Sequence, residues 1–237
     1  MNTKIKANSY NPDDYERPSV AVDIVLFSII EAKLKTLLIK RGSLPYMGDW
    51  AFPGGFVEID ESLDNAAYRE LKEETNIDQS QIYLEQLYTF GKPNRDPRMR
   101  VITVTYFALV SVDKLNNPQA GDDAADVGWF SVFNPPDLAF DHSDILKYAI
   151  TRLRYKLEYS AVGFQLMPET FTLRELQESY EIILVEKLDK GNFRSKLRRT
   201  NVIEPTKFYR DTRGRPARLY QFKVDAVAEI KTRRLFP

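Results

Sequence analysis

The sequence contains no cysteine and a single histidine, His142, among its 237 residues. The lack of cysteine excludes disulfide bonds, zinc–thiolate sites and thiol catalysis. No apolar stretch reaches transmembrane length, because the run over residues 20–30 is interrupted by Asp23. The first 18 residues also lack the apolar core of a signal peptide. These absences predict a cytoplasmic protein.

The formal net charge is zero, but the charges are unevenly distributed. Residues 151–237 carry 19 Lys and Arg against 11 Asp and Glu, a balance of +8 that leaves −8 for residues 1–150. With 43% hydrophobic residues, the chain can bury a sizeable core. We therefore expect an acidic domain followed by a smaller basic one.

A cluster of carboxylates lies within a predicted helix over residues 63–75. Ser62 is a good N-cap, Asp64 places negative charge in the first turn, and Asn76 can adopt the left-handed conformation that ends a helix. Helical spacing puts three carboxylates on one face and apolar side chains toward a core. The carboxylates are Glu70, Glu73 and Glu74, and the apolar residues are Ala66, Ala67 and Leu71.

Clustered carboxylates repel one another unless a cation lies between them, and their hard oxygen atoms favour Mg²⁺ or Mn²⁺. Arg69, four residues before Glu73, could orient that carboxylate. The alternative is a solvated acidic helix face. The preceding WAFPGGFV over residues 50–57 argues against it, because its Pro-Gly-Gly bend lets backbone approach a ligand closely.

Residues 55–77, GFVEIDESLDNAAYRELKEETNI, resemble the Nudix box. The match comprises a glycine, Glu61 six residues later, Arg69-Glu70-Leu71, Glu73-Glu74 and Ile77. Only the last glycine of the pattern departs, being replaced by Asn76. The resemblance spans residues 18–155 and implies an α/β/α sandwich that hydrolyses a nucleoside diphosphate linked to another group. It also implies a metal bound by Glu70, Glu73, Glu74 and the Gly55 carbonyl.

The surrounding sequence fits such a sandwich. Alternating or β-branched patterns predict strands, and apolar residues at helical spacing predict a closing helix. The predicted strands are residues 21–29, 35–41, 83–90, 101–110 and 127–132, and the helix is 141–155. Together they favour an α/β fold with a mixed sheet.

The turn-rich loop over residues 91–100 carries four cations. It could hold substrate phosphates through Arg95, Arg98 and Arg100, or be a solvated hairpin end. Trp50 could line a base-binding pocket or pack in the core.

An acidic loop and the single histidine are less indicative of function. Asp122, Asp123 and Asp126 could supply a base or a metal ligand, but an exposed loop is favoured. His142 is interpreted as a helix-start residue rather than a catalyst.

The basic region predicts a helix-turn-helix followed by a hairpin. Thr172 and Glu175 form a capping box for one helix, and Asp189 caps a second over residues 190–199. The second helix is basic and suits a major groove, and the hairpin tip suits phosphates or a minor groove. The candidate DNA-binding residues are Lys190, Asn192, Arg194, Lys196, Arg198, Arg213 and Arg215.

RGRPA at residues 213–217, followed by Leu219-Tyr220, resembles the winged-helix tail of Nudix-related transcriptional regulators. That resemblance implies double-stranded DNA as a partner. We expect a homodimer, since DNA-binding proteins of this kind commonly bind operators with two-fold symmetry. The alternative is an accessory winged helix used for dimerisation. The expected division is an arm (1–17), a Nudix domain (18–158), a linker (159–171) and a winged helix-turn-helix (172–237).

Two functions follow, and they are compatible. One is a regulator that senses ADP-ribose or a related nucleotide sugar. The other is a working hydrolase of the ADP-ribose pyrophosphatase type, which the intact acidic box favours. A sugar-responsive repressor with a non-catalytic Nudix domain is a further alternative.

Overall fold

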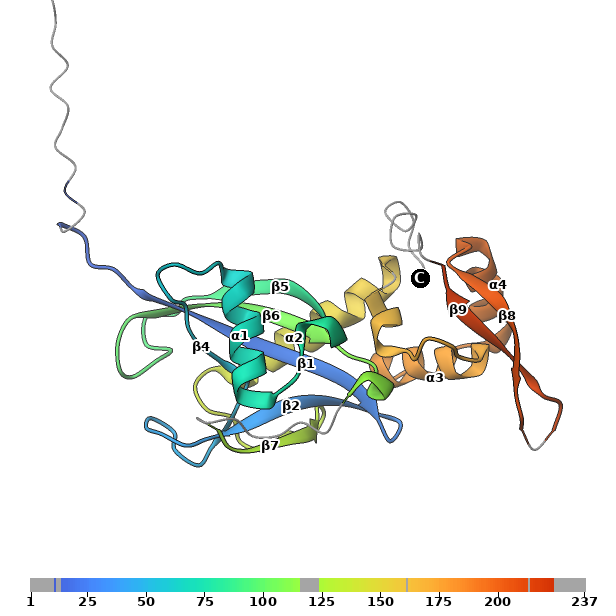
Figure 1. The fold of residues 1–237 in the computed structure, drawn as a ribbon, viewed down its shortest axis with the longest axis horizontal. Coiled ribbons are helices and arrows are strands. Elements are labelled where there is room, and N and C mark those ends of the chain that lie inside the picture. Colours follow the sequence, from blue (N-terminus) through green and yellow to red (C-terminus); the bar gives the residue numbers. More distant parts are fainter. Residues whose placement is uncertain (1–10, 12–13, 116–123, 161, 213, 224–237) are drawn as a thin grey trace, which may run out of the picture.

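The computed structural model describes residues 11, 14–115, 124–160, 162–212 and 214–223 (Figure 1). The strands of its larger sheet are β1 (Ser19–Ile30), β2 (Lys33–Arg41), β3 (Trp50–Ala51), β4 (Gly54–Phe56), β5 (Tyr83–Phe90), β6 (Val101–Leu109) and β7 (Ala124–Ser131). The sheet is mixed, with the order β3-β2-β1-β6-β5; β4 also pairs with β1, and β7 with β2. β1 runs parallel to β6 and antiparallel to β2.

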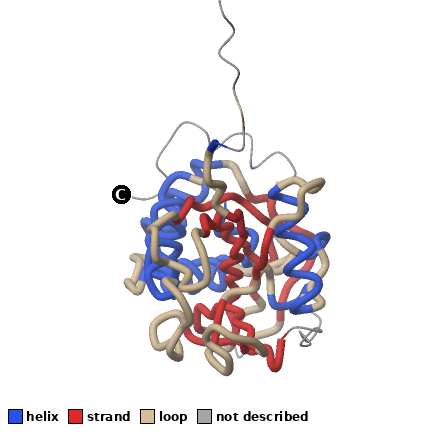
Figure 2. Tube along the Cα trace, turned by 90° about the vertical axis from the view of Figure 1, so that its left-hand side faces the viewer, coloured by secondary structure: helices blue, strands red, loops and turns tan. Residues whose placement is uncertain are grey.

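Helices cover both faces of this sheet (Figure 2). Alternate residues of β1 enter two separate apolar clusters, because successive strand side chains point to opposite faces. Val22 and Ile24 share one cluster with α1 (Leu63–Thr75), whereas Val25 shares the other with α2 (His142–Tyr159). The predicted α/β/α sandwich with a mixed sheet is thereby confirmed.

The predicted caps of α1 are also confirmed. The Ser62 side chain accepts a hydrogen bond from the Asn65 N–H, and Asn76 adopts the left-handed conformation with φ 57°. Thus asparagine ends the helix where the Nudix pattern has glycine. α2 continues four residues beyond its predicted end, since Leu157 is fully buried and extends the apolar stripe.

Two helices and a hairpin make up the rest of the described chain. α3 (Leu173–Leu184) begins with the predicted capping box, and α4 (Lys190–Thr200) is capped by Asp189. β8 (Ile203–Arg210) pairs antiparallel with β9 (Ala217–Phe222), forming the wing of a winged helix. The described residues also include the short 3-10 helices η2 (Gln79–Gln81), η3 (Val112–Lys114) and η4 (Val162–Leu166). No described helix is both long and apolar enough to cross a membrane.

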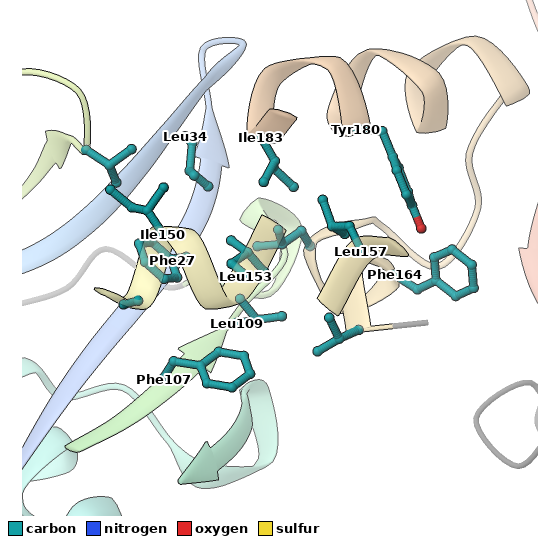
Figure 3. Close-up of a cluster of buried hydrophobic side chains, with 14 of the residues drawn as sticks. Phe27, Leu34, Phe107, Leu109, Ile150, Leu153, Leu157, Phe164, Tyr180 and Ile183 are labelled. Atoms are coloured by element: carbon teal, nitrogen blue, oxygen red, sulfur yellow. The ribbon is translucent and has the colours of Figure 1, made fainter. Parts of the chain in front are cut away.

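The sandwich and the winged helix share one apolar core (Figure 3). Leu153 and Leu157 of α2 are fully buried in the same cluster as Phe164 of η4 and Tyr180 of α3. The Arg154 Nε also donates to the Ile183 carbonyl oxygen at 2.9 Å. The segment expected to be a linker therefore contains a packed 3-10 helix, and α2 contacts both parts of the molecule.

Candidate functional site

Arg69 ties together the acidic groups of the Nudix-like helix. Its guanidinium donates to both carboxylate oxygens of Glu61, at 2.6 and 3.1 Å, and to Glu70 at 2.8 Å and Glu73 at 3.0 Å. It also donates to the Phe56 carbonyl oxygen at 3.2 Å. The hydrogen bonds to Glu61 are the main cause of the raised pKa of Arg69. The arginine thus fixes the loop after β4 to α1.

Glu74 lies apart from this arginine, against the backbone of β4. It is buried and accepts a hydrogen bond from the Gly54 N–H at 2.8 Å. Burial is the largest cause that raises the pKa of Glu74, to about 8, and the nearby charges of Glu70 and Asp23 raise it further. A Cβ at position 55 would collide with the Glu70 carboxylate, so the Gly55 backbone and that carboxylate lie in direct contact.

The chemistry of this donor set fits a divalent cation. Glu70 and Glu74 are carboxylates with raised pKa values beside a backbone that only glycine permits, and a cation would offset their mutual repulsion. Glu73 is more exposed, at 58%, and is held by Arg69. Across the described residues, no three Asp, Glu or His side chains converge as a metal cage. The residues are therefore of the kind that binds a divalent cation. Of the three carboxylates, those of Glu70 and Glu73 are paired with Arg69.

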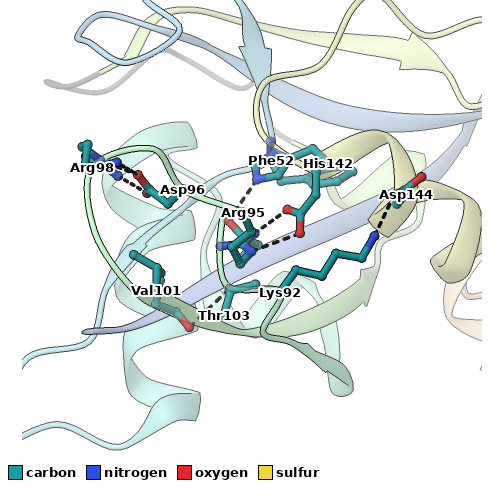
Figure 4. Close-up of polar contacts among 12 residues, drawn as sticks. Phe52, Lys92, Arg95, Asp96, Arg98, Val101, Thr103, His142 and Asp144 are labelled. Atoms are coloured by element: carbon teal, nitrogen blue, oxygen red, sulfur yellow. Dashed lines mark hydrogen bonds and ion pairs between the residues drawn. The ribbon is translucent and has the colours of Figure 1, made fainter. Parts of the chain in front are cut away.

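A small cavity of about 60 Å³ adjoins Gly54 and Gly55. Several of its lining residues belong to a buried polar network (Figure 4). Arg95, only 4% exposed, pairs with Asp23 at 3.3 Å and with Asp141 at 2.7 Å. Burial would raise the pKa of Asp23, but His142 and Arg95 lower it to about 2. Asp23 is therefore ionised at neutral pH.

His142 belongs to the same network. Its Nδ1 accepts a hydrogen bond from the Phe52 N–H at 3.0 Å, and its Nε2 faces an oxygen of Asp23 at 3.5 Å. The ring proton therefore belongs on Nε2. The residue begins α2, as predicted, and positions the cavity wall.

Of the four predicted substrate-binding residues, two line the cavity, and Arg100 and Trp50 do not. Arg95 and Arg98 line the cavity, and Arg98 pairs with the buried Asp96 at 2.7 Å. The alternative of a solvated hairpin end does not describe Arg95 and Asp96, which are both buried. Arg100 is exposed and donates to the carbonyl oxygens of Lys92 and Val101.

Trp50 packs against Phe130, with ring centroids 4.5 Å apart, and does not line the cavity. Of the acidic loop, Asp122 and Asp123 lie outside the described residues, and Asp126 is exposed.

Sequence patterns did not assign Asp23, Asp141 or Arg41 to the site, and they did not show the full role of Glu61. Asp23 and Asp141 meet Arg95 across 72 and 46 residues, a separation that no local pattern shows. Glu61 was visible in the spacing of the box, but its place as the main partner of Arg69 was not. Arg41, at the end of β2, also lines the cavity.

The candidate DNA interface lies on α4 and the wing. Phe193 and Leu197 are buried against α3, as predicted, while Lys190, Asn192 and Arg198 are exposed. Two predicted residues, Arg194 and Lys196, are partly buried, and the buried Arg194 Nε has no hydrogen-bond partner among the described residues. On the wing, Arg215 is exposed, and Arg213 lies outside the described residues.

Comparison with protein families assigns both regions. Residues 18–149 match the model of the NUDIX domain, and residues 163–222 match that of the NrtR DNA-binding winged helix domain. The chain belongs to the Nudix family, as an NrtR-type regulator with a winged helix. The resemblance drawn from the box and from RGRPA is therefore confirmed.

Known proteins similar to this Nudix chain include a transcriptional repressor and a pyrophosphatase. The ADPR responsive transcriptional repressor NtrR of Acinetobacter baylyi is 40% identical over 215 residues, covering 90% of this chain and 85% of that protein. The ADP-ribose pyrophosphatase of Methanocaldococcus jannaschii is 44% identical over 133 residues, covering 56% and 73%. The crystal structure of Shewanella oneidensis NrtR with a 27mer DNA has a TM-score of 0.79 at 35% identity, covering 91% and 98%.

Proposed function

We propose that this NrtR-type protein is a transcriptional regulator that binds ADP-ribose or a related nucleotide sugar and hydrolyses its pyrophosphate in a metal-dependent reaction. The observation that carries the proposal is the presence, in one chain, of an intact Nudix carboxylate set and a basic helix-turn-helix. A repressor named for its response to ADP-ribose is related over 90% of the chain, which supports the same assignment.

We assign the Nudix domain to residues 18–158 and the DNA-binding domain to 172–237, with an arm (1–17) and a connecting segment (159–171). Glu70, Glu73, Glu74 and the Gly55 carbonyl would hold Mg²⁺ or Mn²⁺. Such an ion neutralises pyrophosphate charge and helps to position an attacking water. The chain itself holds Glu74 through the Gly54 N–H, and Arg69 orients Glu70 and Glu73. Arg95 and Arg98 form the cationic side of the cavity.

Helix α2 is the proposed route between ligand and DNA. Its first residue, His142, lines the cavity, and Asp141 before it pairs with Arg95. Its last turns bury Leu153 and Leu157 against α3, where Arg154 donates to the Ile183 carbonyl. A displacement at the cavity would therefore reach the first helix of the DNA-binding domain through packed side chains.

On DNA, we assign the contacts to Lys190, Asn192, Arg194, Lys196, Arg198, Arg213 and Arg215. The protein would act in the cytoplasm as a homodimer on duplex DNA. The competing function is a dedicated ADP-ribose pyrophosphatase whose winged helix serves dimerisation. The similarity to an ADP-ribose pyrophosphatase over the Nudix domain favours retained hydrolysis under either function.

The test is phosphate-coupled hydrolysis of a panel containing ADP-ribose, NADH, sugar nucleotides and nucleoside triphosphates, with Mg²⁺ or Mn²⁺. We expect turnover of ADP-ribose or a near relative. Parallel binding measurements identify any ligand that is bound but not cleaved. Tight binding without turnover would reduce the Nudix domain to a sensor, and neither binding nor turnover of any nucleotide sugar would overturn the proposal.

A further inference from the structure

Arg41 differs from the other charged residues that line the cavity. Arg95 is paired with Asp23, and Arg98 with Asp96. Arg41 forms no ion pair within the described part of the chain. A half-buried guanidinium outside an ion pair is unusual, because the charged form loses hydration.

The local structure holds this side chain in place. The Arg41 Nε donates to the Pro45 carbonyl oxygen at 2.8 Å, and its backbone exchanges hydrogen bonds with Asp49 and Gly48, each at 2.9 Å. The guanidinium lies 4.9 Å from the centre of the Phe140 ring. None of these contacts engages the two terminal nitrogens. Four N–H donors therefore remain for a group in the cavity.

The electrostatic surroundings favour an anion there. Burial is the largest cause that lowers the pKa of Arg41, and the charge of Arg98 lowers it further, whereas the charges of Glu74, Asp96 and Asp23 act in the opposite direction. The pKa of Arg41 is lowered overall, so a bound anion would stabilise the charged guanidinium. Planar guanidinium groups bind phosphate oxygens in pairs, a geometry that lysine does not reproduce. We propose that Arg41 binds a phosphate of the nucleoside diphosphate ligand, with Arg98 beside it.

This assignment rests on the proposed function for the identity of the ligand, but its test does not. Binding of ADP-ribose, ADP, inorganic pyrophosphate and adenosine is measured by calorimetry on the full chain and on three variants. Arg41→Ala removes the donors, Arg41→Lys keeps the charge without the fork, and Arg174→Ala removes an exposed arginine of α3 that pairs with Glu178. Thermal melting and DNA binding verify that each variant is folded.

We expect Arg41→Ala to weaken binding of the phosphorylated ligands about 10- to 100-fold, the range for a hydrogen-bonded charge. The affinity of Arg41→Lys for these ligands should lie between those of the wild type and Arg41→Ala, and the affinity of Arg174→Ala should match that of the wild type. Adenosine, which has no phosphate, should bind all four proteins alike.

Equal affinities of wild type and Arg41→Ala for every phosphorylated ligand would overturn the assignment. If the wild type binds ADP or pyrophosphate but not ADP-ribose, the proposed ligand is contradicted. The role of Arg41 is then decided by comparing the affinities of the wild type and Arg41→Ala for ADP or pyrophosphate, whichever binds. A wild-type protein that binds none of the phosphorylated ligands would overturn both.

Discussion

The two parts of the molecule use charge in opposite ways. In the Nudix domain, two arginines are held in networks of internal ion pairs: Arg69 pairs with three glutamates, and Arg95 with two aspartates. On α4, the exposed Lys190, Arg198 and Arg199 form no ion pair with the described residues. Paired charges build a site of fixed shape, whereas unpaired surface cations are available to an external polyanion.

This contrast locates the two proposed activities in separate groups of residues. A substitution in the internal pairs should change hydrolysis or stability, and one among the exposed cations should change DNA binding alone. Helix α2, which reaches from the cavity to α3, is then the element through which the two can influence each other. Arg41 fits the same division, because it is the cavity arginine left for a ligand.

The largest expected effect is on turnover. Glu74→Gln should lower metal-dependent hydrolysis by roughly 10²–10⁴-fold, because it removes a buried carboxylate from the centre of the box. The fold should survive, since glutamine can still accept from the Gly54 N–H. Steady-state hydrolysis is compared with DNA affinity, which should be unchanged. Wild-type rates in this variant would remove Glu74 from the metal site.

The next effect is on stability. Arg95→Met should lower the free energy of unfolding by about 3–5 kcal/mol, because the carboxylates of Asp23 and Asp141 would lose the arginine that neutralises them. Urea unfolding measures the change. Arg174→Met breaks an exposed ion pair and should leave the unfolding midpoint in place. Equal midpoints for the two variants would show that the Arg95 network is not the support we describe.

A smaller effect concerns pH. Asp23 has its pKa lowered from an ordinary 3.8 to about 2 in the folded state. Its contribution, about 2 kcal/mol, is therefore present above pH 3.8 and is lost as the pH falls toward 2. Asp23→Asn should show a flatter loss of stability than the wild type across this window. Parallel curves for the two proteins in acid urea titrations would contradict the assignment.

Removal of one wing cation should have the smallest effect. Arg215→Ala should weaken binding to duplex DNA about three- to tenfold and lower the slope of log affinity against log salt by about one. Hydrolysis should not change. Lys33→Ala, at the start of β2, serves as the matched loss of a surface cation and should bind DNA normally. An unchanged salt slope in Arg215→Ala would count against a phosphate contact at the wing.

Local patterns predicted most of the architecture. Caps, helical spacing and strand alternation depend on residues close in sequence, so α1, β5 and both helix starts of the winged helix lie where the sequence places them. The box likewise places Glu70, Glu73 and Glu74 on one helix.

What local patterns could not predict was how distant segments meet. The pairing of Arg95 with Asp23 and Asp141 depends on β1, a loop and α2 meeting in three dimensions. For the same reason, the sequence alone does not show that Arg95 is buried in an ion-pair network at the cavity wall. The packing of η4 between the two domains was also invisible, since Gly163 and Pro168 are typical of a linker.

The central claim is that ligand binding at the Nudix domain alters DNA binding by the winged helix. It is tested most directly by titrating ADP-ribose into the protein bound to fluorescent duplex DNA selected from a random-sequence pool, and following anisotropy. The account predicts that saturating ADP-ribose changes the DNA dissociation constant at least fivefold, and that Arg41→Ala needs more ligand to do so. An unchanged DNA affinity in the presence of bound ADP-ribose would contradict it.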